Sequence, residues 1–412
     1  MRKNILFVET GYGFGGAVTC LSALLRQLDK KKYNPALVFS QTDSATKNFL
    51  VSKDWKTIHL ARYRGGKKLK QLVENSSKYG CILKKTLVSI SFLIKKLYSI
   101  PFFIRLYKAA KSHKADLIHI NNCFNANIEA LLVALFLNIP CIAHVRGGVY
   151  NSFEARFIAR RIAHFIAVSG YIRDELIRFG IPAGKITVVY DGLDFEAVEL
   201  KKTEAGKLKA FNGAFKRCNV GIFSCLVGWK GHEIFIKAVD CLIKEKKIRD
   251  CSFFIVGSAD SANQGLDEKL RVQVQELGLG DYIVFTGYQS NVYPFVQKMD
   301  IIVHTSTMPE PLGMVIIEAM ALGKPVIASA IGGPIEIIKD GLDGFLVSPS
   351  DPRALAEKIY ELLRNKETLR EISKNAKLKA RGQFSLDFHA EQIENIYGQG
   401  ITKYREPKLC TS

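Results

Sequence analysis

Long uninterrupted apolar stretches are missing from this 412-residue chain. No run of eighteen uncharged apolar residues occurs, so no segment clearly spans a membrane. The N-terminal apolar run at 5–8 is too short for a signal peptide. The nine cysteines form no C-x-x-C pair and mostly lie in apolar runs. This distribution argues against a disulfide framework or a zinc site and favours reduced thiols in a cytosolic protein.

Acidic residues are scarce in the first half of the chain. Residues 1–190 contain 30 Lys and Arg but 10 Asp and Glu, a balance of +20, whereas residues 191–412 contain 29 of each. A generally basic proteome would spread the excess over both halves. Because the whole excess lies in the first half, that half is expected to meet an anionic partner.

The chain is too long for one ordinary hydrophobic core, so two domains are expected. Strand-like and helix-like patterns alternate along it, which predicts an α/β fold with parallel sheets covered on both faces. A polar, charged stretch at 200–218 is the expected linker. The predicted strands are 3–9, 36–40, 117–121, 141–145, 165–169 and 186–190 before the linker, and 220–226, 253–257, 283–286, 301–304, 326–329 and 345–347 after it. The predicted helices include 17–32, 231–246, 267–277, 292–298, 313–322, 352–364 and a C-terminal segment at 385–397.

Two carboxylates, Glu310 and Glu318, lie eight positions apart around a predicted helix start. A turn rich in proline and glycine places Glu310 in a loop and Glu318 inside the helix. The first-turn amides of Leu312, Gly313 and Met314 have no intrahelical acceptor and form an anion site. Ionised carboxylates only accept hydrogen bonds and therefore suit vicinal diols. One element is thus expected to bind a diphosphate through its backbone and two polyols through its side chains, which describes a nucleotide sugar.

Surface glutamates on a solvated helix are the alternative interpretation. The neighbouring residues argue against it, because they are apolar and predict a mostly buried helix. Glutamate is rarely buried without a partner. The apolar positions are Val315, Ile316, Ala319 and Leu322.

The run from Glu310 to Ser329 resembles the E-x7-E motif of the retaining family 4 glycosyltransferases, which have the GT-B fold. The resemblance covers most of the chain and is strongest from about 219 to 365. It implies two Rossmann-like parallel-sheet domains that face each other across a cleft. Residues 1–200 would bind the acceptor and residues 206–385 the nucleotide-sugar donor. A C-terminal helix, at about 386–412, would cross back to the first domain.

Lys230, in the segment 226–232, resembles the second cation of the family's R-x4-K segment, where both cations neutralise the diphosphate leaving group. The first cation aligns with Cys225, which has no such charge. Either Lys230 suffices, together with the amides at 312–314 and the Gly-Gly turns, or another basic side chain substitutes. Arg146 in the first domain is a candidate for that role.

The first half offers two further site positions by resemblance. Gly15 and Gly16 follow the first strand, and the family uses this turn beside the donor phosphates and acceptor; a plain tight turn is the alternative. The glycine spacing does not match the G-x-G-x-x-G fingerprint, so a dinucleotide site is not expected. His144 ends the strand 141–145, where related enzymes carry a histidine that touches the donor sugar; a core histidine is the alternative.

The segment 82–107 combines apolar and aromatic residues with lysine pairs at 84–85 and 95–96 and with Arg105. The lysines interrupt any spanning run. Aromatic and basic residues together on a helix favour an interfacial location at an anionic membrane. A core helix with a basic outer face is the alternative.

The sequence therefore predicts a retaining glycosyltransferase that moves a hexose-type sugar from a nucleotide sugar, expected to be UDP-linked, to a glycan or lipid-linked acceptor in surface polysaccharide assembly. Glu310, Lys230 and His144 are the expected catalytic residues. No metal, cofactor or nucleic acid is expected. The protein is expected in the cytoplasm, peripherally at the inner face of the cytoplasmic membrane. A nucleotide-sugar 2-epimerase of the same fold and a catalytically silent sugar-binding or scaffold protein are the alternatives.

Overall fold

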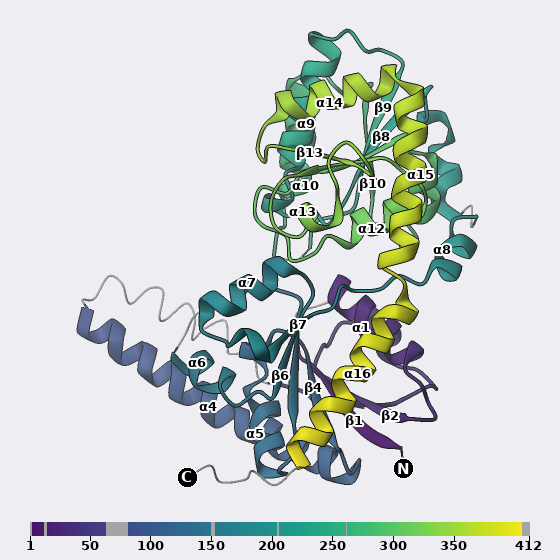
Figure 1. Ribbon diagram of the computed structural model, residues 1–412. Coiled ribbons are helices and arrows are strands. Elements are labelled where there is room, and N and C mark those ends of the chain that lie inside the picture. The colour runs from purple at the N-terminus through teal and green to yellow at the C-terminus, as the bar shows by residue number, and fades with distance from the viewer. Residues whose placement is uncertain are drawn as a thin grey trace. The chain divides into compact units, whose positions relative to one another are not determined.

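The computed structural model describes residues 2–11, 15–62, 81–149, 153–203, 206–260 and 262–405. The chain divides into two compact units (Figure 1). Unit 1 consists of 1–168, 172–189 and 390–412, and unit 2 of 169–171 and 190–389. The main boundaries between the two units fall between residues 189 and 190 and between 389 and 390. The domains predicted from the sequence were 1–200 and 206–385, with the returning helix from about 386.

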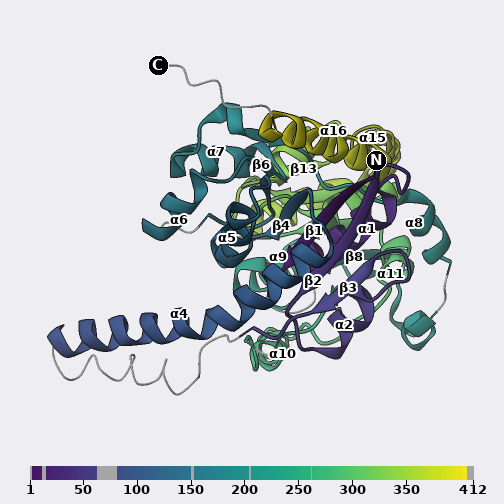
Figure 2. The same ribbon diagram turned by 90° about the horizontal axis from the view of Figure 1, so that it is seen from below.

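Unit 1 is built on a parallel sheet in the order β3-β2-β1-β4-β5-β6-β7, counted over the described residues. Helices cover both of its faces, as expected for a parallel sheet (Figure 2). The strands are β1 (Lys3–Glu9), β2 (Tyr33–Phe39), β3 (Lys56–His59), β4 (Leu117–Asn122), β5 (Cys141–Val145), β6 (His164–Ala167) and β7 (Ile186–Val188). The helices are α1 (Gly16–Gln27), α2 (Ser44–Leu50), α4 (Cys81–Ser112), α5 (Ile128–Phe136), α6 (Phe153–Ala159) and α7 (Gly170–Phe179).

Unit 2 repeats the same arrangement, with strands in the order β10-β9-β8-β11-β12-β13 among its described residues. The strands are β8 (Cys218–Phe223), β9 (Cys251–Val256), β10 (Ile283–Gly287), β11 (Ile301–His304), β12 (Val326–Ser329) and β13 (Phe345–Val347). The helices are α8 (Phe195–Lys201), α9 (His232–Lys244), α10 (Leu266–Glu276), α11 (Tyr293–Lys298), α12 (Met314–Ala321), α13 (Pro334–Ile337), α14 (Pro352–Arg364) and α15 (Lys366–Gln383).

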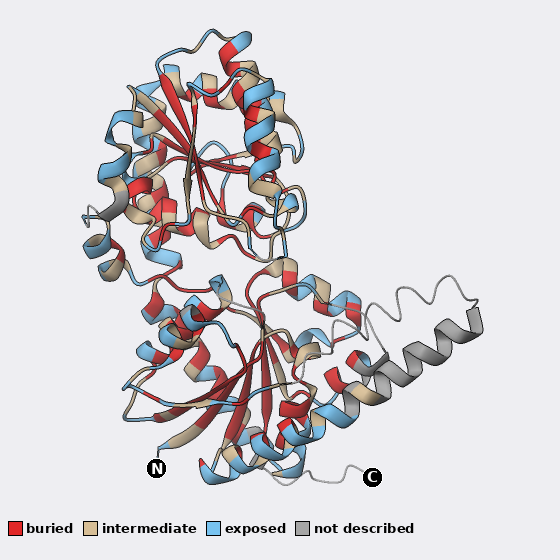
Figure 3. Ribbon diagram, turned by 180° about the vertical axis from the view of Figure 1, so that it is seen from behind, coloured by how far each residue is buried: buried red, intermediate tan, exposed pale blue. Residues whose placement is uncertain are grey.

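The strands form because their β-branched and aromatic runs are buried on both faces of each sheet (Figure 3). In unit 2 the central strands β8 and β11 contribute Val220, Ile222, Ile301 and Val303 to the core, each at most 2 % exposed. Neighbouring parallel strands align their carboxyl ends at one edge. The loops that leave those ends are consequently brought together in each unit.

The C-terminal helix α16 (Leu386–Arg405) belongs mostly to unit 1. Its apolar side packs into the core of that unit through Ala390, Ile393 and Tyr397. The Tyr397 hydroxyl contacts His119 Nδ1 at 2.7 Å, and the Glu394 carboxylate accepts from the Asp29 amide at 2.8 Å. The helix extends beyond the predicted 385–397, while residues 406–412 lie outside the described part.

The expected linker at 200–218 is wrong as a structural element. The chain forms α8 just before it and a 3-10 helix at Gly206–Ala214 within it, and both group with unit 2. Polar composition suggested a connection, but Phe211 packs edge-on against Phe295 of α11, with ring centroids 5.6 Å apart. The sequence also missed strand β3, which lies at the edge of the sheet and has no fully buried residue.

Candidate functional site: a buried carboxylate at the switch point of unit 2

The strand order of unit 2 reverses between β8 and β11, the two central strands. Connections from these strands leave in opposite directions, and open α/β sheets bind ligands outside such a switch point. The loop after β8 carries Lys230 at the end of a 3-10 helix, Gly228–Lys230. The loop after β11 carries Glu310. Two positions eighty residues apart in sequence therefore meet at one sheet edge.

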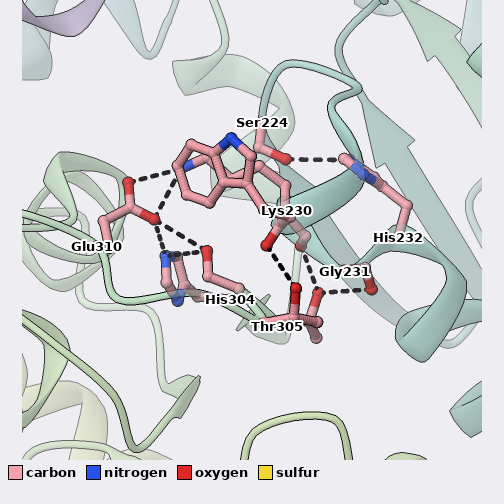
Figure 4. Close-up of polar contacts among 10 residues, drawn as sticks. Ser224, Lys230, Gly231, His232, His304, Thr305 and Glu310 are labelled. Atoms are coloured by element: carbon pink, nitrogen blue, oxygen red, sulfur yellow. Dashed lines mark hydrogen bonds and ion pairs between the residues drawn. The ribbon is translucent and has the colours of Figure 1, made fainter. Parts of the chain in front are cut away.

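Lys230 and Glu310 form a close ion pair (Figure 4). The Lys230 ammonium lies 2.5 Å from Glu310 Oε1 and 2.7 Å from Oε2. Both side chains are largely withdrawn from solvent, at 14 % and 12 % exposed. The Lys230 ammonium also lies 4.4 Å from the centre of the Trp229 ring. The cation is thus fixed on one side by an aromatic face and on the other by a carboxylate.

Two more donors reach the same carboxylate. His304 Nε2 lies 2.8 Å from Glu310 Oε2, and the Ser306 hydroxyl donates to that oxygen at 2.9 Å. Because an ionised carboxylate only accepts, His304 must carry its proton on Nε2. Burial alone would raise the pKa of Glu310, but the His304 hydrogen bond and the charge of Lys230 hold the pKa well below its usual range. Glu310 is therefore ionised at neutral pH.

The two loops that carry Lys230 and Glu310 are joined by hydrogen bonds from Thr305 to backbone carbonyls. The Thr305 hydroxyl donates to the carbonyls of Lys230 and Gly231, both at 3.0 Å. Gly231 adopts a φ of +71°, and a Cβ there would lie 1.9 Å from the Thr305 carbonyl oxygen. Glycine is needed at this position because the two loops approach too closely for a side chain.

The turn before α13 also packs closely on the loop that carries Glu310. The Gly333 amide donates to the Glu310 carbonyl at 2.8 Å. A Cβ on Gly332 would lie 2.6 Å from the Glu310 backbone, and one on Gly333 would lie 2.5 Å from the Leu312 backbone. These glycines therefore allow the turn before α13 to pack directly on the loop that presents Glu310.

Helix α12 begins at Met314, with Gly313 as its N-cap at a φ of +103°. Leu312 is buried just before it. Glu318 lies in the second turn of this helix, where burial raises its pKa to about 7, against partial compensation from the charge of Lys201 and a hydrogen bond with Tyr293. Glu318 and Glu310 thus have pKa values shifted in opposite directions.

Cys225 lies in the loop that follows β8 and is exposed. Its thiol donates to the Ser258 carbonyl at 3.2 Å. Burial of the sulfur and the charge of Asp260 raise its pKa. The thiol is therefore neutral at physiological pH. It supplies no charge at the position that aligns with the first cation of the R-x4-K segment.

Unit 1 positions its predicted residues at the carboxyl ends of its own strands. Gly15 is the N-cap of α1 and Gly16 its first residue, and a Cβ on either would meet no described atom within 4 Å. Arg146 follows β5 and is 8 % exposed, with its guanidinium hydrogen-bonded to Asn121. His144 is completely buried, its ring 5.5 Å from that of His119.

Sequence reasoning missed part of the environment of Glu310. Ser306 and Trp229 were not singled out, although both flank predicted site positions. His304, the last residue of β11, contacts Glu310 directly. In the described part of the chain, no group of three or more His, Cys, Asp or Glu side chains is placed to hold a metal ion. Among the helices that the structure describes, none is long and apolar enough to cross a membrane.

Comparison with known proteins shows the family. The model of glycosyl transferases group 1 matches residues 218–379, and that of glycosyltransferase family 4 matches residues 14–197. The glycosyltransferase MJ1178 of Methanocaldococcus jannaschii is 30 % identical over 313 residues, 73 % of this chain and 80 % of that protein. The chain belongs to the family 4, group 1 glycosyltransferases and has their GT-B fold.

Two further relatives are informative. A UDP-Gal:alpha-D-GlcNAc-diphosphoundecaprenol alpha-1,3-galactosyltransferase of Escherichia coli is 26 % identical over 324 residues, 74 % of this chain and 80 % of that protein. Among solved structures, Anabaena Alr3699/HepE in complex with UDP and glucose superposes with a TM-score of 0.78 at 24 % identity, covering 97 % of this chain and 100 % of that one.

Proposed function

We propose that this protein transfers a hexose-type sugar from a UDP-sugar to a glycan or lipid-linked acceptor, with retention of anomeric configuration, in surface polysaccharide assembly. The observation that carries the proposal is the Lys230–Glu310 pair at the switch point of unit 2, beside the first turn of α12. Anion-binding amides, one cation and an ionised carboxylate lie at one sheet edge. A diphosphate joined to a sugar needs that combination.

Each residue has a role in this proposal. Glu310, ionised and oriented by His304 and Ser306, accepts hydrogen bonds from donor-sugar hydroxyls. The amides of Leu312, Gly313 and Met314 face the sugar or the phosphates. Glu318 accepts from the ribose diol. Lys230 stabilises the departing diphosphate as the bond to the anomeric carbon breaks and positive charge develops on the sugar.

Lys230 is neutralised by Glu310. When the donor binds, the charge of Lys230 is shared between Glu310 and the diphosphate. The largely buried ammonium thus keeps a partner, which avoids the cost of an isolated buried charge. Unit 1 is assigned further contacts with the donor phosphates, the donor sugar and the acceptor. The residues assigned to them are Gly15, Gly16, His144 and Arg146.

Unit 1 is assigned to bind the acceptor. The same unit is assigned a peripheral contact with the cytoplasmic face of an anionic membrane. Leu97, Tyr98, Ile100 and Ile104 of α4 are between 45 % and 56 % exposed. Phe136 of α5, 72 % exposed, packs against Phe103 of α4 with ring centroids 5.6 Å apart. The basic excess of the first half belongs to the same part of the sequence as these apolar side chains. The lysine pairs at 84–85 and 95–96 have side chains outside the described residues.

The test begins with a panel of nucleotide sugars screened for thermal stabilisation, because a ligand that binds only the folded state raises its unfolding temperature. Transfer from the best donor is then measured for the wild type, Glu310→Ala and the control Glu361→Ala, which removes an exposed glutamate of α14. Glu310→Ala is expected to lose transfer by about 100-fold or more while the fold is kept.

Near-normal transfer by Glu310→Ala would contradict the assignment, whereas Glu361→Ala is expected to match the wild type. Incubation with the donor and no acceptor separates the reactions further. A transferase leaves the sugar nucleotide unepimerised, while conversion to a 2-epimer would identify an epimerase.

A further inference from the structure

Unit 1 has a buried polar cluster at its own switch point, which lies between β1 and β4. Glu9 ends β1, Gln41 follows β2, Asn121 lies near the end of β4 and Arg146 follows β5. Their exposed fractions are 0, 1, 1 and 8 % respectively. Four strands thus contribute one hydrogen-bonding side chain each to the same edge. Buried charges are costly, so this arrangement requires a reason beyond packing.

The cluster is a continuous chain of hydrogen bonds. Glu9 Oε1 accepts from the Gly11 amide at 2.5 Å and from Gln41 Nε2 at 3.2 Å. Glu9 Oε2 accepts from Asn121 Nδ2. Asn121 Oδ1 in turn accepts from the Arg146 guanidinium. The Asn121 amide therefore stands between a carboxylate and a guanidinium.

The direction of this chain is determined by Arg146. A guanidinium only donates, so Asn121 has to present its oxygen to Arg146 and its amino group to Glu9. Burial raises the pKa of Glu9, while hydrogen bonds from Asn121 and Gly11 and the charge of Arg146 favour the ionised form. The same carboxylate holds Gly11, the residue at which the glycine-rich segment 11–16 begins.

We propose that Glu9 is a positioning residue of the transfer reaction, which orients the Arg146 guanidinium through Asn121 and holds Gly11 at the start of the glycine-rich segment. The inference rests on the proposed function, in which Arg146 and the Gly15-Gly16 turn act on the donor and acceptor. A guanidinium held in a fixed orientation is suited to bind anionic oxygens, such as those of a phosphate.

The test exchanges the amide and the carboxylate. In Glu9→Gln, the carbonyl stays with Gly11 and Gln41, and the new amino group faces the amino group of Asn121. In Asn121→Asp, two carboxylates face each other. In the double variant Glu9→Gln/Asn121→Asp, the amide at 9 donates to the carboxylate at 121, which still accepts from Arg146. The double variant restores the hydrogen bonds between positions 9 and 121 and between 121 and Arg146 with the opposite arrangement of side chains. It loses only the long donation from Asn121 Nδ2 to the Ala17 carbonyl, which is 3.4 Å in the wild type.

Each single variant is expected to reduce transfer, as kcat/KM for the acceptor, by about 10- to 100-fold, since small displacements of positioning groups have effects of that size. The double variant is expected to recover to within about 5-fold of the wild type, as coupled neighbours do. The UDP-induced rise in unfolding temperature is expected to shrink in the two single variants, because Arg146 is assigned to the donor phosphates, and to recover in the double variant. Asp116→Asn, which removes a carboxylate that contacts the Asn4 amide at the amino end of β4, is the control and is expected to leave transfer unchanged.

Wild-type transfer by both single variants, or a double variant no better than the product of the singles, would overturn the proposal. Failure of the proposed function has a different result, because the wild type would then transfer sugar from no donor in the panel. In that case the same variants are compared by unfolding temperature. A lower unfolding temperature in both single variants without recovery in the double variant would refute the proposed coupling of Glu9 to Arg146 through Asn121.

Discussion

At the scale of single residues, Glu310 and Glu318 are distinguished by their neighbours and not by their chemistry. Glu310 is hydrogen-bonded by Lys230, His304 and Ser306 and stays ionised, whereas the carboxylate of Glu318 is desolvated with weaker compensation and has a pKa of about 7. A carboxylate that titrates near neutral pH gains from ligand hydroxyls that favour its charged form. The two glutamates of one motif thus titrate in different pH ranges.

The raised pKa of Glu318 predicts a pH dependence of stability. Between the ordinary value of 4.5 and about 7 the folded protein binds more protons at this group than the unfolded chain. Its contribution to the free energy of unfolding is therefore full below pH 4.5 and is lost as the pH rises through 7. Glu318→Gln is expected to remove that part of the slope. Denaturant unfolding at pH 5 and pH 7.5 measures it, and an unchanged difference between the two pH values would contradict the assigned pKa.

Cys225 offers a gain-of-function test. The thiol is exposed and neutral, so an arginine has room to extend and adds the cation that the family pattern has there. Cys225→Arg is expected to tighten UDP binding by about 10-fold, and the gain is expected to shrink with added salt because it is electrostatic. Isothermal titration with UDP checks this. Cys225→Gln, uncharged but also extended, is the control, and an equal gain there would show that charge is not the cause.

At the scale of elements, the turn before α13 holds the loop that presents Glu310 by backbone contact. Gly333 has an ordinary helical φ of −56°, so the obstacle to a side chain is the Leu312 backbone and not its own conformation. The pairing of Glu310 with Gly332 extends the same contact as an isolated parallel bridge. A short turn with no catalytic side chain thus determines where Glu310 lies.

Gly333→Ala is consequently expected to displace the Glu310 loop. Its Cβ would meet backbone atoms at 2.5 Å, which have to move. Transfer is expected to fall by about 100-fold, from a displacement of about 1 Å, with a smaller effect on the unfolding temperature. Gly280→Ala is the comparison, because its Cβ would meet no described atom within 4 Å. Equal activities of the two variants would show that the contact does not position Glu310.

At the scale of the whole molecule, charge is divided between the two halves of the sequence. The first half has a balance of +20 and the second a balance of zero, so the two are expected to have different electrostatic partners. Segment 81–114 contains eight Lys and Arg and no Asp or Glu, and its described part exposes apolar side chains. Basic and apolar groups on one helix bind anionic lipid more strongly than either alone.

The whole chain is therefore expected to sediment with vesicles that contain anionic lipid and to be released as salt increases. Leu97→Asp/Phe136→Asp is expected to weaken this binding by about 10-fold or more, because two exposed apolar side chains are replaced by charges that repel the vesicle. Leu378→Asp changes an equally exposed leucine of α15 in unit 2 and is expected to bind as the wild type does. Indifference of the wild type to vesicles would instead indicate an acceptor free in solution.

Much of the fold was predictable because its signals are local. The strands Cys141–Val145, Ile301–His304, Val326–Ser329 and Phe345–Val347 occur where short apolar runs predicted them. Residues 200–218 were misinterpreted because their few apolar side chains, such as Phe211, gain their partners from α11, far away in the sequence. Edge strand β3 was missed because only one of its neighbours is a strand.

By itself the sequence determined the two parallel sheets, the family and the positions of Glu310, Glu318 and Lys230 in loops or helix starts. Only the tertiary structure decided which of those carboxylates is paired, which glycines hold Glu310 and how Glu9, Asn121 and Arg146 connect. Periodicity and turn residues act over a few neighbours and can be read along the chain. Ionisation and hydrogen-bond direction depend on side chains brought to one sheet edge from distant strands, and the strand order of the folded sheet decides which ones meet.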